Sequence, residues 1–74
     1  MNKTNDNPQG AALLIGCLED IAASANEALK QRGASSTIGR SIILQYKKKP
    51  GRLLYYDKAT GRVCVDYKIA ANGN

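Results

Sequence analysis

No histidine occurs among the 74 residues of the chain. Histidine is the commonest general base and the commonest metal ligand, so its absence removes the usual means of acid–base catalysis and of metal binding. The serines Ser35, Ser36 and Ser41 have no imidazole to activate them, which excludes a serine triad. We therefore expect a binding protein rather than an enzyme, with no catalytic residues, no cofactor and no metal site.

The sequence also lacks a CxxC pair and a long apolar run. Cys17 and Cys64 lie far apart in the chain, and we expect reduced thiols, with a single disulfide as the alternative. The apolar run 11–15 is soon followed by Glu19 and Asp20, which makes it too short for a membrane span, and no signal-peptide pattern is present. These features predict a cytoplasmic protein that makes no use of a membrane.

One helix is predicted over residues 8–32, after a flexible polar arm at 1–7. Asn7 suits the N-cap and Pro8 the first helical position, while Gly33 suits the position after the last turn. The apolar residues recur at spacings of three and four, which is typical of one helical stripe: Ala11, Leu14, Leu18, Ile21, Ala25, Ala28 and Leu29.

After a linker at 34–37, β-branched and aromatic residues become frequent and two turn signals appear. Lys49-Pro50-Gly51-Arg52 matches a type II turn, and the segment from Asp57 to Arg62 matches a type I turn closed by Gly61. We therefore predict strands at 38–48, 52–57 and 62–69. The expected fold class is α+β, with one long N-terminal helix packed on a three-stranded antiparallel meander (α-β-β-β). Residues 8–70 would form a single domain, and 71–74 a short tail.

The turns fix a register in which Asp57 lies opposite Arg62, and the register assigns two sheet faces. We expect the helix to cover the face that carries Ile43, Leu54, Tyr56, Val63, Val65, Tyr67 and Ile69. The other face would then be an open apolar interface, formed by Ile42, Leu44, Tyr46, Leu53 and Tyr55 together with Cys64. Exposed patches of this kind mark interaction sites, and because so small a domain has a thin core, a homodimer built by sheet stacking is one expected use.

The positive charge is concentrated in the second half of the chain. Residues 1–33 carry three cations against four anions, a net charge of −1, whereas residues 34–74 carry eight against two, a net charge of +6. Four of the eight cations lie in the predicted first hairpin, at 47–52. One interpretation is structural, because lysines at a hairpin tip are often simply solvated and discourage pairing between sheet edges. The functional interpretation is contact with phosphates, with tyrosines beside the cations to stack on bases. The nucleic-acid-binding residues predicted on this basis are Arg40, Lys47, Lys48, Lys49, Arg52 and Arg62.

Three functional hypotheses follow. The first is a small non-enzymatic protein whose basic surface binds nucleic acid or a nucleoprotein complex. The second is an inhibitor or adaptor, of the type encoded by phages and mobile elements, that binds a host protein through the open Tyr/Leu face. The third is based on the segments 51–56 (GRLLYY) and 62–65 (RVCV), which resemble part of the sheet of RelE-like toxins. That resemblance implies a ribonuclease that uses Arg, Lys and Tyr instead of His, but the leading strand and second helix of the family are missing from the expected fold, so we rank it last.

Overall fold

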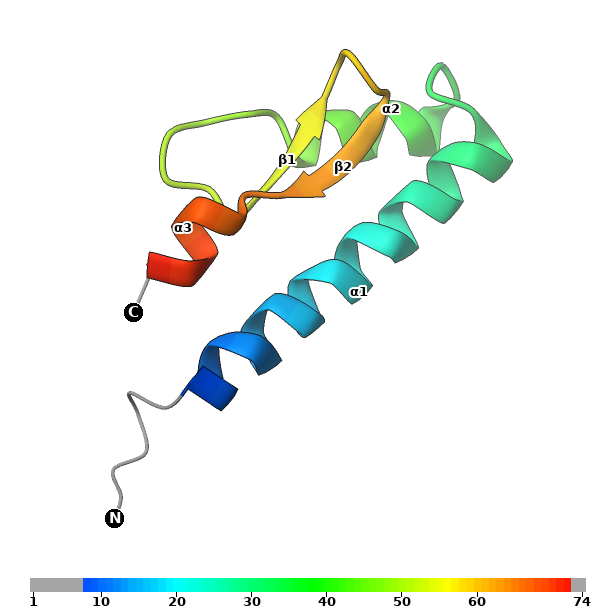
Figure 1. The fold of residues 1–74 in the computed structure, drawn as a ribbon. Coiled ribbons are helices and arrows are strands. Elements are labelled where there is room, and N and C mark those ends of the chain that lie inside the picture. Colours follow the sequence, from blue (N-terminus) through cyan, green and yellow to red (C-terminus); the bar gives the residue numbers. More distant parts are fainter. Residues whose placement is uncertain (1–7, 73–74) are drawn as a thin grey trace.

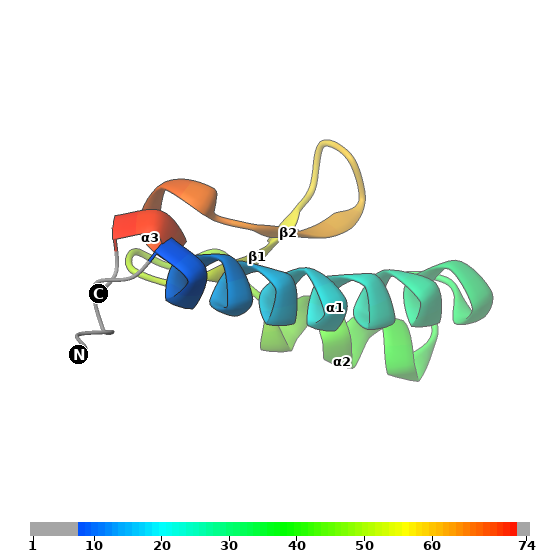
Figure 2. The same cartoon turned by 60° about the horizontal axis from the view of Figure 1, so that its bottom comes forward.

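The computed structural model describes residues 8–72 and contains three helices and one β-hairpin in that range (Figure 1). In chain order the elements are α1 (Pro8–Arg32), α2 (Thr37–Gln45), β1 (Leu54–Asp57), β2 (Arg62–Val65) and α3 (Tyr67–Asn72). Figure 2 shows α2 on one side of the C-terminal half of α1, and the hairpin with α3 on another. The expected arm at 1–7, including the Asn7 cap, lies outside the described residues.

The bounds predicted for the long helix are confirmed by α1. Lys30 and Arg32 lie in its last turn, where the carbonyl end of the helix dipole favours cations. Gly33 follows with a φ of 92°, and its N–H donates to the Leu29 carbonyl at 2.8 Å. A left-handed residue of this kind ends the helix while satisfying one of its last carbonyl groups.

The α+β class is confirmed, but the three-stranded meander is wrong, because the sheet has two strands and residues 37–45 form α2 instead of a strand. Ser36 caps α2: its hydroxyl accepts the Gly39 N–H at 2.9 Å and donates to the Gly33 carbonyl at 2.7 Å. The apolar residues Ile42, Ile43 and Tyr46 recur at helical spacing, so they reach the core from one side of α2. The cap and this spacing outweigh the strand preference of the isoleucines.

The second predicted hairpin is confirmed in its register. Asp57 pairs with Arg62 and Leu54 with Val65, and Gly61 has a φ of 71° with its N–H bonded to the Asp57 carbonyl at 2.7 Å. The last predicted strand, 62–69, is too long. Asp66 accepts the Ile69 N–H through its carboxylate at 3.2 Å and begins α3, which includes residues 71 and 72 of the expected tail.

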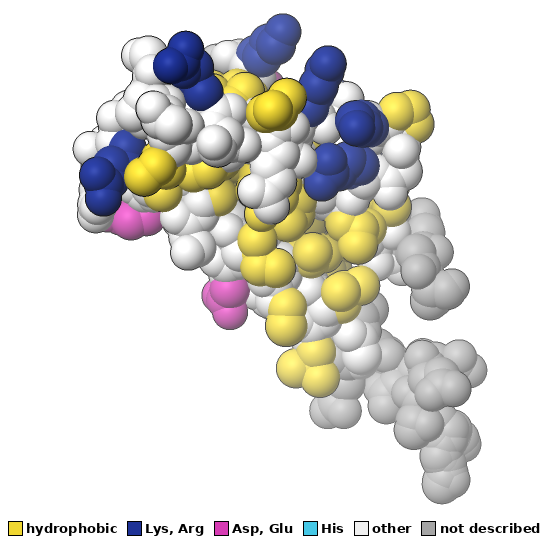
Figure 3. Space-filling view, turned by 180° about the vertical axis from the view of Figure 1, so that it is seen from behind, with side chains coloured by type: hydrophobic (Ala, Val, Ile, Leu, Met, Phe, Trp, Pro, Cys, Tyr) yellow, Lys and Arg dark blue, Asp and Glu magenta, His cyan; other side chains and the backbone are white. Residues whose placement is uncertain are grey.

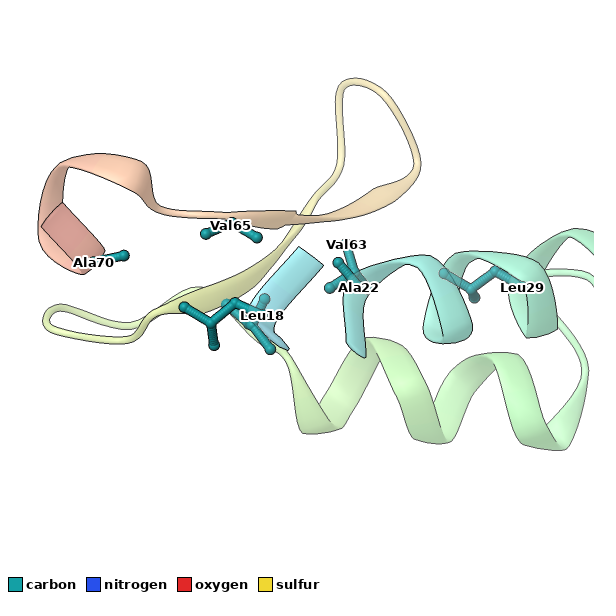
Figure 4. Packing of buried hydrophobic residues seen from close by; sticks show 7 residues of the cluster. Leu18, Ala22, Leu29, Val63, Val65 and Ala70 are labelled. Atoms are coloured by element: carbon teal, nitrogen blue, oxygen red, sulfur yellow. The ribbon is translucent and has the colours of Figure 1, made fainter. Parts of the chain in front are cut away.

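The core lies where α1, α2, the hairpin and α3 meet, and Figure 4 shows the buried side chains that α1, the hairpin and α3 contribute to it. Among the described residues, the buried hydrophobic ones are Leu18, Ala22, Leu29, Leu54, Val63, Val65 and Ala70. The prediction that Leu54, Val63 and Val65 share the covered face is therefore confirmed, whereas Tyr67 is 52% exposed. Its hydroxyl instead donates to the Glu19 carboxylate at 2.7 Å, and this bond ties α3 to α1 and raises the pKa of Tyr67.

The side chain of Asn26 in α1 forms two hydrogen bonds with the backbone at one edge of the hairpin. Its side-chain amide donates to the Val63 carbonyl at 2.9 Å, and its oxygen accepts the Val63 N–H at 2.6 Å. Val63 forms a pair with Tyr56 in the ladder, and the Tyr56 N–H points the other way, to the Tyr46 carbonyl at 2.7 Å. Backbone groups at a sheet edge need partners when the edge is buried. One side chain of α1 and the end of α2 supply them here.

Replacing Asn26 should therefore weaken the fold out of proportion to the size of the side chain. We expect Asn26→Ala to lower the free energy of unfolding by about 2–3 kcal/mol, because it leaves two backbone groups of Val63 without partners. Asn26→Asp should also destabilise, since a carboxylate cannot donate to the Val63 carbonyl. Urea denaturation measures both, with Gln31→Ala as the control, because the amide of Gln31 bonds only the exposed Glu27. A loss no larger than that of the control would contradict this role.

Gly39 allows the first turn of α2 to contact the end of α1. A Cβ at this position would clash with the Gly33 carbonyl oxygen and lie 2.9 Å from the Cα of Ala34. Gly39 is buried, so these backbone atoms have little room to move. By contrast, a Cβ at Gly16 in α1 would meet nothing within 4 Å.

The same substitution should consequently have opposite effects at the two glycines. Gly16→Ala should stabilise the protein by about 0.5–1 kcal/mol, because alanine is the better helix former. Gly39→Ala should destabilise it by about 1–3 kcal/mol, because the clash exceeds that gain. Thermal or urea denaturation of both variants decides the point, and stabilisation by Gly39→Ala would show that α2 does not approach α1 as described.

Candidate nucleic-acid interface

A pocket of about 360 Å³ lies where α2, the loop that follows it and the hairpin meet. The loop reverses at Pro50-Gly51, where Gly51 has a φ of 82° and the Arg52 N–H reaches the Lys49 carbonyl at 3.3 Å, so the predicted turn is confirmed. This reversal returns the chain to β1 and places the loop lysines beside it. The lining residues are Ile43, Lys47, Lys48, Tyr55, Tyr56, Asp57 and Lys58.

The pocket has a charged rim and a mainly apolar interior. The lysines at 47, 48 and 58 are exposed, whereas Ile43, Tyr55 and Tyr56 are half-buried. The exposed lysines therefore form the charged rim of the pocket, and the half-buried side chains form its apolar walls. Asp57 adds one carboxylate, and its Oδ1 already accepts the Ala59 N–H at 3.0 Å.

The Tyr55 ring is in contact with a cation. The Lys48 Nζ lies 5.0 Å from the ring centroid, within the range of a cation–π interaction. Burial raises the pKa of Tyr55, and the nearby acidic groups Cys64, Asp57 and Asp66 raise it further. The phenol is therefore neutral at pH 7, and its ring does not repel an anionic ligand.

Arg52 contacts the end of α2 through a hydrogen bond and a ring contact. Its Nη1 donates to the Gln45 carbonyl at 2.8 Å, and its guanidinium carbon lies 6.0 Å from the Tyr46 ring centroid. A cation at the carbonyl end of a helix is stabilised by the helix dipole. Arg52 thus holds the loop against the end of α2, which positions the lysines rather than joining them at the rim.

The structure brings together only part of the predicted nucleic-acid set. Lys47 and Lys48 line the pocket, and Lys49 is exposed in the turn beside it. Arg40 is exposed on the first turn of α2. Arg62, the first residue of β2, lines a separate depression with residues of α1 that include Glu27 and Lys30. Lys58 also lines the pocket but is not among the predicted residues, because the hairpin turn, and not its place beside Asp57 in the turn signal, brings it there.

The predicted interface residues do not share one open sheet face. Ile42, Tyr46 and Leu53 pack against the core, Tyr55 lines the pocket, and Leu44 is 72% exposed. They differ because 37–45 is helical, so its side chains do not alternate between two faces. Figure 3 shows an apolar band on one face of the molecule, with Lys and Arg side chains along its upper edge. The large exposed apolar residues are Leu13, Leu14, Ile21, Ile38, Leu44 and Tyr67.

No protein-family model, curated protein or solved structure matches the chain. Among residues 8–72, no group of three or more cysteine, aspartate or glutamate side chains is placed to hold a metal ion. None of the helices in the described part of the chain has the length and hydropathy needed to cross a membrane. The thiols of Cys17 and Cys64 are both free.

Proposed function

We propose that the chain is a non-enzymatic protein that binds nucleic acid, alone or in a nucleoprotein complex, through the 47–52 loop and the pocket beside it. The observation that carries this proposal is the convergence of three lysines and two tyrosine rings on one recess. The lysines come from two segments that are separated by β1, so the fold, and not only the lysine run, concentrates the charge. Both cytoplasmic location and reduced thiols are part of the proposal.

Each group of residues has a distinct role in the proposal. Lys47, Lys48 and Lys58 neutralise phosphates, which releases counterions and supplies most of the affinity. Tyr55 offers a neutral ring to a base. Arg52 positions the loop through its bond to the Gln45 carbonyl. The net charge of +5 favours encounter with any polyanion. A test of the site must therefore compare the loss of cations at the pocket with the loss of the same number of cations elsewhere.

Removing the three rim lysines should weaken binding and its dependence on salt. We expect the Lys47→Ala, Lys48→Ala, Lys58→Ala triple variant to bind a labelled oligonucleotide more weakly, with the slope of log affinity against log salt reduced by about 2 for a single strand. Fluorescence anisotropy at several salt concentrations measures both quantities. Arg52 is left in place so that the loop keeps its conformation.

The matched control removes the same charge elsewhere. Lys30→Gln, Arg32→Gln and Lys68→Gln together change residues of α1 and α3, outside the pocket. The proposal requires this control to retain most of the affinity. Equal losses in the two triple variants would indicate attraction to the whole cationic chain, and absence of binding at low salt would refute the function altogether.

A second candidate is a protein-binding role as an inhibitor or adaptor, and a feature of α1 favours it. Gly10, Leu14, Cys17, Ile21 and Ser24 recur alternately at spacings of four and three, and all five are exposed or half-exposed. A helix with this spacing suits packing against another helix. The core-facing residues Ile15, Leu18, Ala22, Ala25 and Leu29 form a separate row, so this second row has no partner among the described elements.

The partner that can be tested directly is a second copy of the chain. If α1 self-associates through this row, light scattering should show a dimer whose population rises with concentration, and Ile21→Asp should shift it to monomer. Ala23→Asp adds the same charge at an exposed position outside the row and should leave the dimer intact. A monomer at every concentration would reject self-association.

A further inference from the structure

We infer that the pocket takes one unstacked base of a single-stranded nucleic acid, so that the protein prefers single strands to duplexes. The inference rests on the proposed function and makes it more specific. It depends on the apolar and aromatic side chains that line the pocket, whereas the general proposal depends on the lysines at its rim.

The interior is suited to a base and unsuited to a phosphate. Its half-buried lining residues are Ile43, Tyr55, Tyr56 and Asp57, and the Asp57 carboxylate repels a phosphate. An aromatic wall supplies a π-face on which any base can stack. The exposed lysines at the mouth are placed for the phosphates on either side of that base. A volume of about 360 Å³ is at the lower end for small-ligand pockets, which suits one base rather than several.

A duplex cannot place a base against the aromatic wall of the pocket. Its bases are paired and stacked, so they cannot enter a recess without being flipped out, which costs a few kcal/mol. A duplex could instead be bound by a two-stranded ribbon inserted into its major groove. The structure does not favour it, because Lys47 and Lys48 lie in a loop that folds back beside β1, and Lys48 lies over the Tyr55 ring.

Lys48 connects the two parts of the site. Its ammonium group lies 5.0 Å from the centroid of the Tyr55 ring. An incoming base takes that place on the ring, and the flexible lysine then reaches the adjacent phosphate. The exchange replaces a weak exposed cation–π contact by a stack and an ion pair.

The test compares three ligands of equal length at one salt concentration: a single-stranded oligonucleotide, its duplex, and an abasic strand that keeps the phosphates. For the natural protein we expect the single strand to bind at least 10-fold more tightly than either of the others. Tyr55→Leu should lose about 5- to 100-fold in affinity for the single strand without changing the salt dependence, as expected for one lost stack. Tyr55→Phe keeps the ring and should retain the affinity.

The outcomes separate this inference from the proposed function. If no ligand binds, the proposed function fails. If the duplex or the abasic strand binds as tightly as the single strand, the function stands and the pocket does not hold a base. The abasic comparison uses the unmodified protein, so it remains decisive even if Tyr55→Leu unfolds, which circular dichroism would reveal.

Discussion

The paired hydrogen bonds between the Asn26 side chain and the Val63 backbone are the contact on which the arrangement depends. They join positions 37 residues apart and hold the backbone of β2 at Val63 against α1. Val63 is 3% exposed and Val65 6%, so the apolar face of β2 packs on α1 beside these bonds.

The opposite edge of the hairpin explains how the same constraint reaches the pocket. With Val63 turned toward α1, the N–H of its ladder partner Tyr56 points outward and meets the Tyr46 carbonyl at the end of α2. This bond brings α2 against β1 and sets the base of the loop that carries Lys47 and Lys48. The side chains of Tyr56 and its neighbour Tyr55 both line the pocket. The contact of Asn26 with Val63 thus influences the position of Lys47 and Lys48.

Local signals in the sequence predicted the long helix, both glycine turns and the hairpin register. Each depends on a few adjacent residues: Gly33, Gly51 and Gly61 all have positive φ values where a turn or helix end requires them. The strand predicted at 38–48 is wrong: isoleucine favours strands, but the Ser36 hydroxyl and the close contact at Gly39 make 37–45 a helix. In the candidate site, Lys47, Lys48 and Tyr55 could be anticipated, since charge and ring lie close in sequence. Lys58 and the role of Arg52 could not, because both depend on which backbone groups the fold brings within reach.

The loop between α2 and β1 is anchored at both of its ends, by the Tyr56–Tyr46 bond and by the Asp66 N–H, which reaches the Leu53 carbonyl at 2.8 Å. Since the cost of closing a loop grows only slowly with its length, residues can be inserted between the anchors at small cost to the fold. Among diverging copies of such a chain, length and composition would change fastest here. The core would meanwhile keep its Asn and Gly positions, so one scaffold could acquire new ligands by exchanging a single short segment.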